Sequence, residues 1–188
     1  MTSPLPRIRR LHAVAADERD ALAEVLRDCV AGGASVGFMQ PLAPARARAF
    51  WDRVAAAVHA GERALLVAED AQGIAGTVQL VLAQPDNQPH RADLAKMLVH
   101  RRARRLGLGA ALLSAAEDAA RAHGKTLLVL DTASDEAERL YRRGGWQYVG
   151  EVPDFALWPH GGPCATRFFY RRIGDARHAP ASAPGSEA

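Results

Sequence analysis

The chain has 188 residues, a formal net charge of +3, 48% hydrophobic residues and 24% charged residues, which are ordinary values for one globular domain. No apolar run approaches the roughly 20 residues of a membrane span, and the N-terminal charges are not followed by the apolar segment of a secretory signal. We therefore expect a cytoplasmic protein in which Cys29 and Cys164, which lack metal-ligand spacing, remain reduced thiols.

Hydrophobic spacing in the first half of the chain predicts two helices between a first strand and a hairpin. Asp17 is the expected N-cap of the first helix, and Gly61 stands where the end of a helix favours glycine. The expected elements are a strand over 6–13, a helix over 17–31, a glycine-rich loop over 32–39, a helix over 43–60, and hairpin strands over 64–69 and 74–82.

In the second half, strands and helices alternate. Ser134 is the expected cap of a short helix that ends at Gly144. The other expected elements are a strand over 92–99, a helix over 108–123, a strand over 126–131, and strands over 146–152 and 167–173. We expect residues 1–174 to form a single domain, and residues 175–188, which are rich in Ala, Pro and Ser, to form a disordered tail.

The segment from Arg104 to Gly109 joins an expected strand to an expected helix. Unpaired backbone N–H groups and the helix dipole favour phosphate at such a junction. Because Gly107 and Gly109 lack a Cβ, a phosphate oxygen can approach the main chain. Two other phosphate motifs are excluded. A dinucleotide fingerprint needs a small residue in place of Leu112, and the P-loop-like triplet 124–126 follows a helix instead of a strand.

Basic side chains gather over residues 100–105, directly before this loop. Such a cluster can bind nucleic acid. However, no helix-turn-helix, zinc-finger or aromatic base-stacking pattern accompanies it, and a coenzyme with several phosphates is the simpler explanation. Arg101 and Arg102 are individually interpreted as part of a solvated basic turn.

Arg104, Gly107 and Gly109 match the signature Q/R-x-x-G-x-G/A, and the expected element order is β-α-α-β-β-β-α-β-α-β-β. In both respects the chain resembles the GCN5-related N-acetyltransferase (GNAT) superfamily over roughly residues 6–173. Segments 36–38, 50–51, 88–92, 130–132 and 148–153 resemble the branch that contains the tabtoxin resistance acetyltransferase.

This resemblance implies an α/β (α+β) fold with about four helices and a mixed, mostly antiparallel sheet of about seven strands, split to admit a pantetheine arm. It implies acetyl-CoA as co-substrate and no metal. The coenzyme-binding residues that it implies are Met97, Leu98, Val99, Arg104, Arg105, Leu106, Gly107, Leu108, Gly109 and Ala110.

Acetyl transfer to an amine requires a neutral nucleophile, stabilisation of the developing oxyanion, and a proton for the departing thiolate. By resemblance, Tyr141 is the general acid and Asp131 accepts the proton of the acceptor ammonium, while a backbone N–H of 97–99 meets the oxyanion. From the residues alone, a core tyrosine is the favoured interpretation of Tyr141, and only the resemblance favours the general acid. Asp131 could equally be an Asx-turn or a helix cap.

The acceptor amine is expected near Glu69, a candidate for water-mediated base chemistry or ammonium binding that could also be a simple hairpin-end charge. His90, otherwise a structural or surface residue like His100, is a second candidate. The loop with Gly33, Ser35 and Phe38 is a candidate lid, for which a plain connecting loop is the alternative.

The resulting prediction is an acetyl-CoA-dependent N-acetyltransferase that acts by direct transfer on a primary amine of a small molecule, as in detoxification of an antibiotic or toxin. Neither cysteine stands where the resemblance places a nucleophile, which argues against an acetyl-enzyme. The alternatives are a protein N-acetyltransferase, a non-catalytic acyl-CoA-binding regulatory module and, third, a nucleic-acid-binding protein. Exposed edge strands are compatible with a homodimer.

Overall fold

A computed structural model describes residues 7–174, and the expected C-terminal tail over 175–188 lies outside the described residues. The elements follow the order expected from the sequence. They are β1 (Arg7–Leu11), α1 (Ala16–Ala31), α2 (Pro44–His59), β2 (Arg63–Asp70), β3 (Gly73–Val81), β4 (Arg91–Val99), a 3₁₀ turn η1 (Arg101–Ala103), α3 (Leu108–Ala122), β5 (Leu127–Thr132), α4 (Asp135–Arg143), β6 (Gln147–Leu157) and β7 (Pro163–Arg172).

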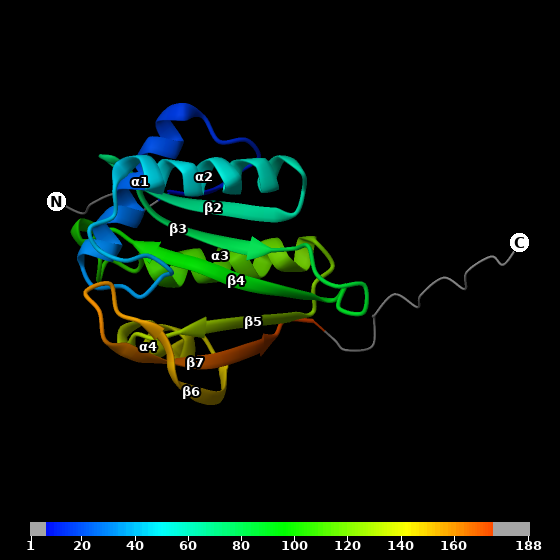
Figure 1. Cartoon of the computed structure of the whole chain (residues 1–188). Coiled ribbons are helices and arrows are strands. Elements are labelled where there is room, and N and C mark those ends of the chain that lie inside the picture. The colour runs from blue at the N-terminus through cyan, green and yellow to red at the C-terminus, as the bar shows by residue number, and fades with distance from the viewer. Residues whose placement is uncertain (1–6, 175–188) are drawn as a thin grey trace, which may run out of the picture.

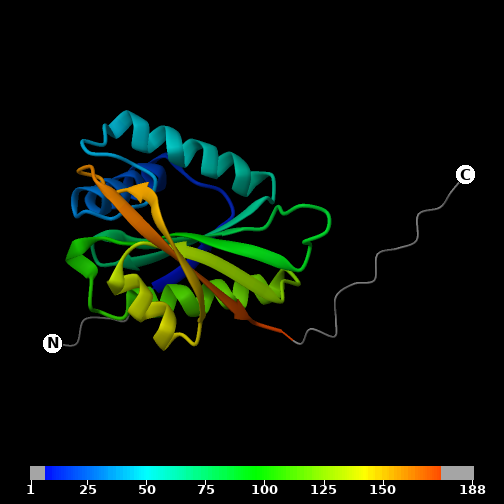
Figure 2. The same ribbon diagram turned by 60° about the horizontal axis from the view of Figure 1, so that its bottom comes forward.

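The seven strands form one mixed sheet in the order β1-β2-β3-β4-β5-β7-β6. Only β4 and β5 are parallel neighbours, and α3 makes the crossover between them. Helices α1 and α2 lie on one face of the sheet, and α3 and α4 lie on the other (Figures 1 and 2). This is the split α/β architecture that the sequence predicts.

Each face of the sheet carries its own hydrophobic core. Trp51 and Leu26 are fully buried between α1, α2 and the sheet, while Leu112 and Phe169 are fully buried between α3 and the other face. The apolar helix faces need this cover because burying a large side chain contributes about 1.5–3 kcal/mol. The two cores thereby hold the helices against both faces of the sheet.

Strands β4 and β5 pair only at their beginnings, from Arg91↔Leu127 to Asp93↔Val129. Farther on, β4 contains a bulge in which Lys96 and Met97 together face one residue of β3, Val78. Lys96 adopts a φ of 50°, which is uncommon for a residue other than glycine. The bulge bends β4 in the part of the strand that follows Asp93 and no longer pairs with β5.

The bulge also changes which face of the sheet each side chain meets. Leu94 belongs to the core under α3, whereas Leu98, four positions later, belongs to the core under α1 and α2. In a regular strand two residues four apart share a face. One inserted residue is therefore enough to place the two halves of β4 in different cores.

Two local predictions need correction. The N-cap of α1 is Ala15 and not Asp17, because Glu18 in the first turn accepts a hydrogen bond of 2.8 Å from the Ala15 N–H. Strands β6 and β7 extend farther toward their hairpin than expected, through an irregularity near Asp154, whose φ is 52°. In the part of the chain that the structure describes, no helix is long and apolar enough to cross a membrane.

Candidate active site

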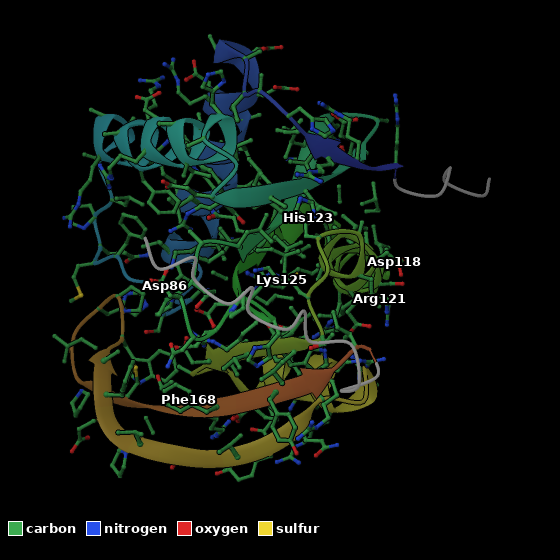
Figure 3. The ribbon with its side chains drawn as sticks, turned by 90° about the vertical axis from the view of Figure 1, so that its right-hand side faces the viewer. Asp86, Asp118, Arg121, His123, Lys125 and Phe168 are labelled. Carbon is green, nitrogen blue, oxygen red and sulfur yellow. The ribbon has the colours of Figure 1, made fainter. Side chains whose placement is uncertain are left out.

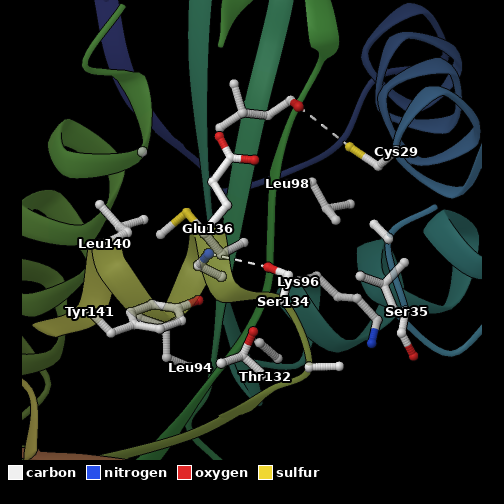
Figure 4. Close-up of a pocket in the computed structure, with 18 of the residues that line it drawn as sticks. Cys29, Ser35, Leu94, Lys96, Leu98, Thr132, Ser134, Glu136, Leu140 and Tyr141 are labelled. Carbon is white, nitrogen blue, oxygen red and sulfur yellow. Dashed lines mark hydrogen bonds between the residues drawn. The ribbon is translucent and has the colours of Figure 1, made fainter. Parts of the chain in front are cut away.

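The gap between β4 and β5 opens into a cavity of about 540 Å³. Its walls come from segments far apart in the sequence, namely 34–37 after α1, 94–99 of β4, the loop and first turn of α3, and 131–141 around α4. Figure 4 shows Tyr141 and Leu140 on one side of the cavity and Lys96 and Ser35 on the other.

The first turn of α3 faces this cavity with free backbone donors. Gly107 precedes the helix with a φ of 83° and provides no side-chain cap. Within residues 7–174, the N–H groups of Leu108, Gly109 and Ala110 form no hydrogen bond, although all three residues line the cavity. Three free amides at the positive end of a helix dipole fit an anion such as a phosphate.

Glycine suits positions 107 and 109 for different reasons. Gly107 adopts a left-handed conformation that an L side chain rarely takes, with no atom within 4 Å of the position of an added Cβ. A Cβ on Gly109 would lie 3.1 Å from Cδ2 of Leu140 in α4. Gly107 therefore shapes the loop, and Gly109 allows α4 to pack against the first turn of α3.

The chain between β4 and α3 is anchored from α1. The buried carboxylate of Asp28 accepts hydrogen bonds of 2.8 Å from both the backbone N–H and the side chain of Arg101. Arg104 donates a hydrogen bond of 3.1 Å to the carbonyl of Val99, and Arg102 pairs with Asp70. Arg101 and Arg102 thus lie in an exposed basic turn, as the sequence suggests, and they also tie this turn to Asp28 and Asp70.

Tyr141 is 4% exposed, and its ring packs against Trp146 and Phe169 at centroid distances of 5.7 and 6.1 Å. Its hydroxyl group points toward the cavity (Figure 4), and it forms no hydrogen bond with any other described residue. Burial, assisted by the negative charge of Asp131, raises the pKa of Tyr141 above its ordinary range. The phenol therefore stays protonated at neutral pH.

Asp131 lines the same cavity from the end of β5. Enclosure by the protein raises the pKa of this carboxyl group, and the positive charge of Lys96 opposes the shift. A carboxylate with a raised pKa is a better proton acceptor than a free one. The N-cap of α4 is Ser134, whose hydroxyl accepts a hydrogen bond from the Ala137 N–H, so Asp131 is not needed as a cap.

Most residues of the predicted coenzyme site line the cavity, namely Met97, Leu98, Val99, Arg104, Arg105, Gly107, Leu108, Gly109 and Ala110. Leu106 does not, and it is 65% exposed. From the expected acceptor loop, Ser35 lines the cavity, whereas Gly33 and Phe38 do not. Phe38 instead packs edge-on against Phe50 at a centroid distance of 5.3 Å.

Glu69 and His90 both lie outside the cavity lining. Glu69 accepts hydrogen bonds from Arg9 of the neighbouring strand β1, and its negative charge is paired with this arginine. The carbonyl of His90 accepts hydrogen bonds from the N–H groups of Thr126 and Leu127, at the end of the sheet where β4 and β5 are still paired. The structure therefore does not bring either residue to the acceptor side.

Many cavity residues are absent from the sequence-based set, and two of them, Lys96 and Cys29, bear on the chemistry. Lys96 stands out in the sequence only as a charge within an apolar strand. Cys29 reaches the cavity from α1, and its thiol lies 3.5 Å from the carbonyl of Val99. Burial raises the pKa of Cys29 despite the nearby charge of Arg104, which makes this thiol a poor nucleophile.

The lysine of the P-loop-like triplet is structural. Lys125, labelled in Figure 3, follows α3 and donates hydrogen bonds to the carbonyls of Leu82 and Pro89 at 3.0 and 2.9 Å. Over residues 7–174 there is also no group of three or more His, Cys, Asp or Glu side chains placed to hold a metal ion.

Residues 21–146 match the model of the acetyltransferase (GNAT) family. A phosphinothricin acetyltransferase from Sinorhizobium meliloti in complex with acetyl-CoA has a similar structure, with a TM-score of 0.77 and 20% identity over 95% of each chain.

Two further solved structures are similar at low identity. The putative acetyltransferase yncA from Salmonella typhimurium, solved with acetyl-CoA, matches with a TM-score of 0.75 and 21% identity over 96% of this chain and 100% of that chain. A ribosomal-protein-alanine N-acetyltransferase from Brucella melitensis gives 0.73 and 20% over 88% of this chain and 99% of that chain.

Proposed function

Because the chain belongs to the acetyltransferase (GNAT) family and uses acetyl-CoA as co-substrate, we propose that it transfers the acetyl group directly to a primary amine of a small molecule. The observation that carries this proposal is the cavity between β4 and β5, which is lined by Tyr141 and Asp131 and also by the first turn of α3 with its free amides. Each of these groups fits one requirement of acetyl transfer.

Acetyl-CoA supplies an activated acyl group and several phosphates, and the described residues fit both parts. The free N–H groups at Leu108, Gly109 and Ala110, with the basic side chains of Arg104 and Arg105, are proposed to hold the phosphates. The edge of β4 over 97–99 does not pair with β5. Apart from the Val99 carbonyl, which already accepts hydrogen bonds from Arg104 and Cys29, this edge offers backbone groups to the pantetheine arm and to the acyl oxygen.

The proposed proton path uses the two side chains that lie on either side of the turn after β5. Asp131 accepts a proton from the acceptor ammonium, directly or through water, and leaves a neutral amine. The hydroxyl of Tyr141 donates a proton to the sulfur of the departing thiolate. The raised pKa of Tyr141 supports this role because the phenol stays protonated at neutral pH.

Direct transfer is supported by the state of the thiol that is nearest to the site. Cys29 lines the cavity, but its raised pKa and its contact with the Val99 carbonyl disfavour the thiolate that a covalent acetyl-enzyme needs. A small acceptor is supported by the loop that covers the cavity. Ser35 donates a hydrogen bond of 3.2 Å to the Leu157 carbonyl, which ties this loop to β6.

The test is a screen for thiol release from acetyl-CoA in the presence of small primary amines, with N-terminal peptides of proteins as the second acceptor class. Thiol release with small amines and acetylated product in mass spectrometry are the expected results. Release with peptides alone would favour a protein acceptor. Tight acetyl-CoA binding without release in either series would favour a non-catalytic acyl-CoA-binding module.

A further inference from the structure

The charge of Lys96 has no role in the proton path proposed above. The side chain lines the cavity from the bulge of β4, and its charge is not needed for the pairing of β4 with β3, which is made by the backbone. A half-buried ammonium group is costly unless something compensates for its desolvation. Its presence therefore calls for a ligand or a partner.

The ammonium group lies on the acceptor side of the cavity. The atom Nζ is 3.9 Å from the position of a Cβ on Gly37, in the loop that covers this side. Figure 4 shows the side chain of Lys96 extending toward Ser35, away from Leu140 of α4. Leu140 packs beside Gly109 in the first turn of α3, where the phosphates of acetyl-CoA are proposed to bind. Lys96 is therefore badly placed to serve the coenzyme phosphates.

Lys96 has no direct charge partner in the part of the chain that the structure describes. Among residues 7–174, no carboxylate forms a salt bridge with it and no acceptor forms a hydrogen bond with its ammonium group. The negative charge of Asp131 acts on it from a longer distance, but the positive charge of Arg63 acts in the opposite direction. The acceptor side of the cavity thus contains the ammonium group of Lys96, which has no direct partner among the described residues, and the carboxylate of Asp131, which is proposed to bind the reacting amine.

We propose that Lys96 binds an anionic group of the acceptor, so that the preferred acceptors are amines that also carry a carboxylate or a similar acid. This inference rests on the proposed function, because it assumes that the amine reacts beside Asp131. Asp131 then faces the ammonium end of the acceptor and Lys96 faces its acidic end. An ammonium–carboxylate pair in a partly desolvated cavity discriminates strongly against a neutral analogue.

The test compares matched acceptors in wild type and in Lys96→Met, a substitution that keeps the chain length and removes the charge. The probes are the proteinogenic L-amino acids, β-alanine and 4-aminobutyrate, each paired with its own carboxamide. For acids that wild type acetylates, we expect kcat/KM to fall about 10- to 100-fold in Lys96→Met, with little change for the carboxamides. The matched control is Arg53→Met, which removes an exposed charge on α2.

The ratio of kcat/KM for acid and carboxamide separates recognition from a structural effect. A change in the pKa of Asp131 or a distorted bulge lowers both rates and leaves the ratio unchanged. An unchanged ratio in Lys96→Met, or a preference of wild type for carboxamides, overturns this inference while the acetyltransferase proposal stands. Absence of thiol release with every probe of both series, while other small amines are acetylated, overturns this inference alone. Absence of release with every amine of the wider screen overturns the small-amine proposal, and this inference with it.

Discussion

The side chain of Leu140 packs closely against Gly109: a Cβ added to Gly109 would lie 3.1 Å from Cδ2 of Leu140. Leu140 stands directly before Tyr141 in α4, and Gly109 is part of the first turn of α3. The contact therefore joins the proposed phosphate site to the proposed general acid. A larger side chain at Gly109 disturbs both, and Gly107 is the better position for a test of coenzyme binding alone.

Gly107→Ala should weaken acetyl-CoA binding about tenfold, because it strains the left-handed turn that presents the amides of α3. Gly124→Ala is the matched control, since Gly124 ends the same helix with a φ of 69° and open space around it. Both variants should lose about 1 kcal/mol of unfolding free energy. Calorimetry that gives the two variants the same affinity would place the phosphates elsewhere.

Tyr141→Phe should lower kcat by roughly 10²-fold and leave the KM for acetyl-CoA nearly unchanged, because only the proton donor is lost. The ring contacts with Trp146 and Phe169 remain. The hydroxyl has no hydrogen-bond partner in the part of the chain that the structure describes, so the variant should be at least as stable as wild type. An unchanged kcat on a true acceptor would return Tyr141 to a packing role.

Asp131→Asn should displace the acidic limb of the pH–rate profile to higher pH. In wild type this limb follows the ionisation of Asp131, whose pKa is raised above its ordinary value of about 4. Because asparagine cannot accept a proton from the ammonium group, the variant can acetylate only those acceptor molecules that are already neutral in solution. We expect a loss of rate at neutral pH that is partly recovered in alkaline buffer, and a profile parallel to that of wild type would exclude Asp131 as the base.

Asp28→Asn should destabilise the fold at neutral pH by about 1–3 kcal/mol. Burial alone raises the pKa of Asp28, but the hydrogen bonds from Arg101 outweigh it and hold the pKa below its ordinary value. A lowered pKa contributes stability above the unfolded-state pKa of about 4, and this contribution is lost as the pH falls through the lower folded-state pKa. The deficit should therefore shrink in acid.

Chemical unfolding at pH 7 and near pH 2 measures this difference. Asp52→Asn is the control, because Asp52 is an exposed carboxylate of α2 whose pairing with Arg19 at 3.4 Å contributes little. An Asp28→Asn deficit that is the same at both pH values would mean that the charge of Asp28 does not hold η1.

The sequence predicts β4 to within one residue at its start, yet it contains no signal for the bulge. Bulges are often marked by glycine, whereas this one is built from Lys96 and Met97. The β6–β7 hairpin is underestimated for a related reason, because Pro153 and Asp154 are typical turn residues that here sit within a strand. Both misses concern backbone irregularities that only the neighbouring strands determine.

At the site, local sequence is informative where one continuous segment makes the feature. The loop before α3 is such a segment, and its residues other than Leu106 reach the cavity. The placement of Glu69 and His90 beside the acceptor is wrong because the sequence does not distinguish one strand end from another. The sheet opens only between the later parts of β4 and β5. Cys29 reaches the cavity only because α1 packs against the sheet, a contact that depends on the assembled fold.

The inserted residue in β4 makes segment 95–98 sensitive to length. Deletion of one residue there would put the strand back in step with β3, and Leu98 would turn from the core of α1 toward the core of α3. Every later residue up to the loop before α3 would rotate with it. The course of β4 along the opening therefore depends on the number of residues between the pairs Ala95↔Gln79 and Leu98↔Thr77. Substitutions in this segment should be tolerated better than insertions or deletions.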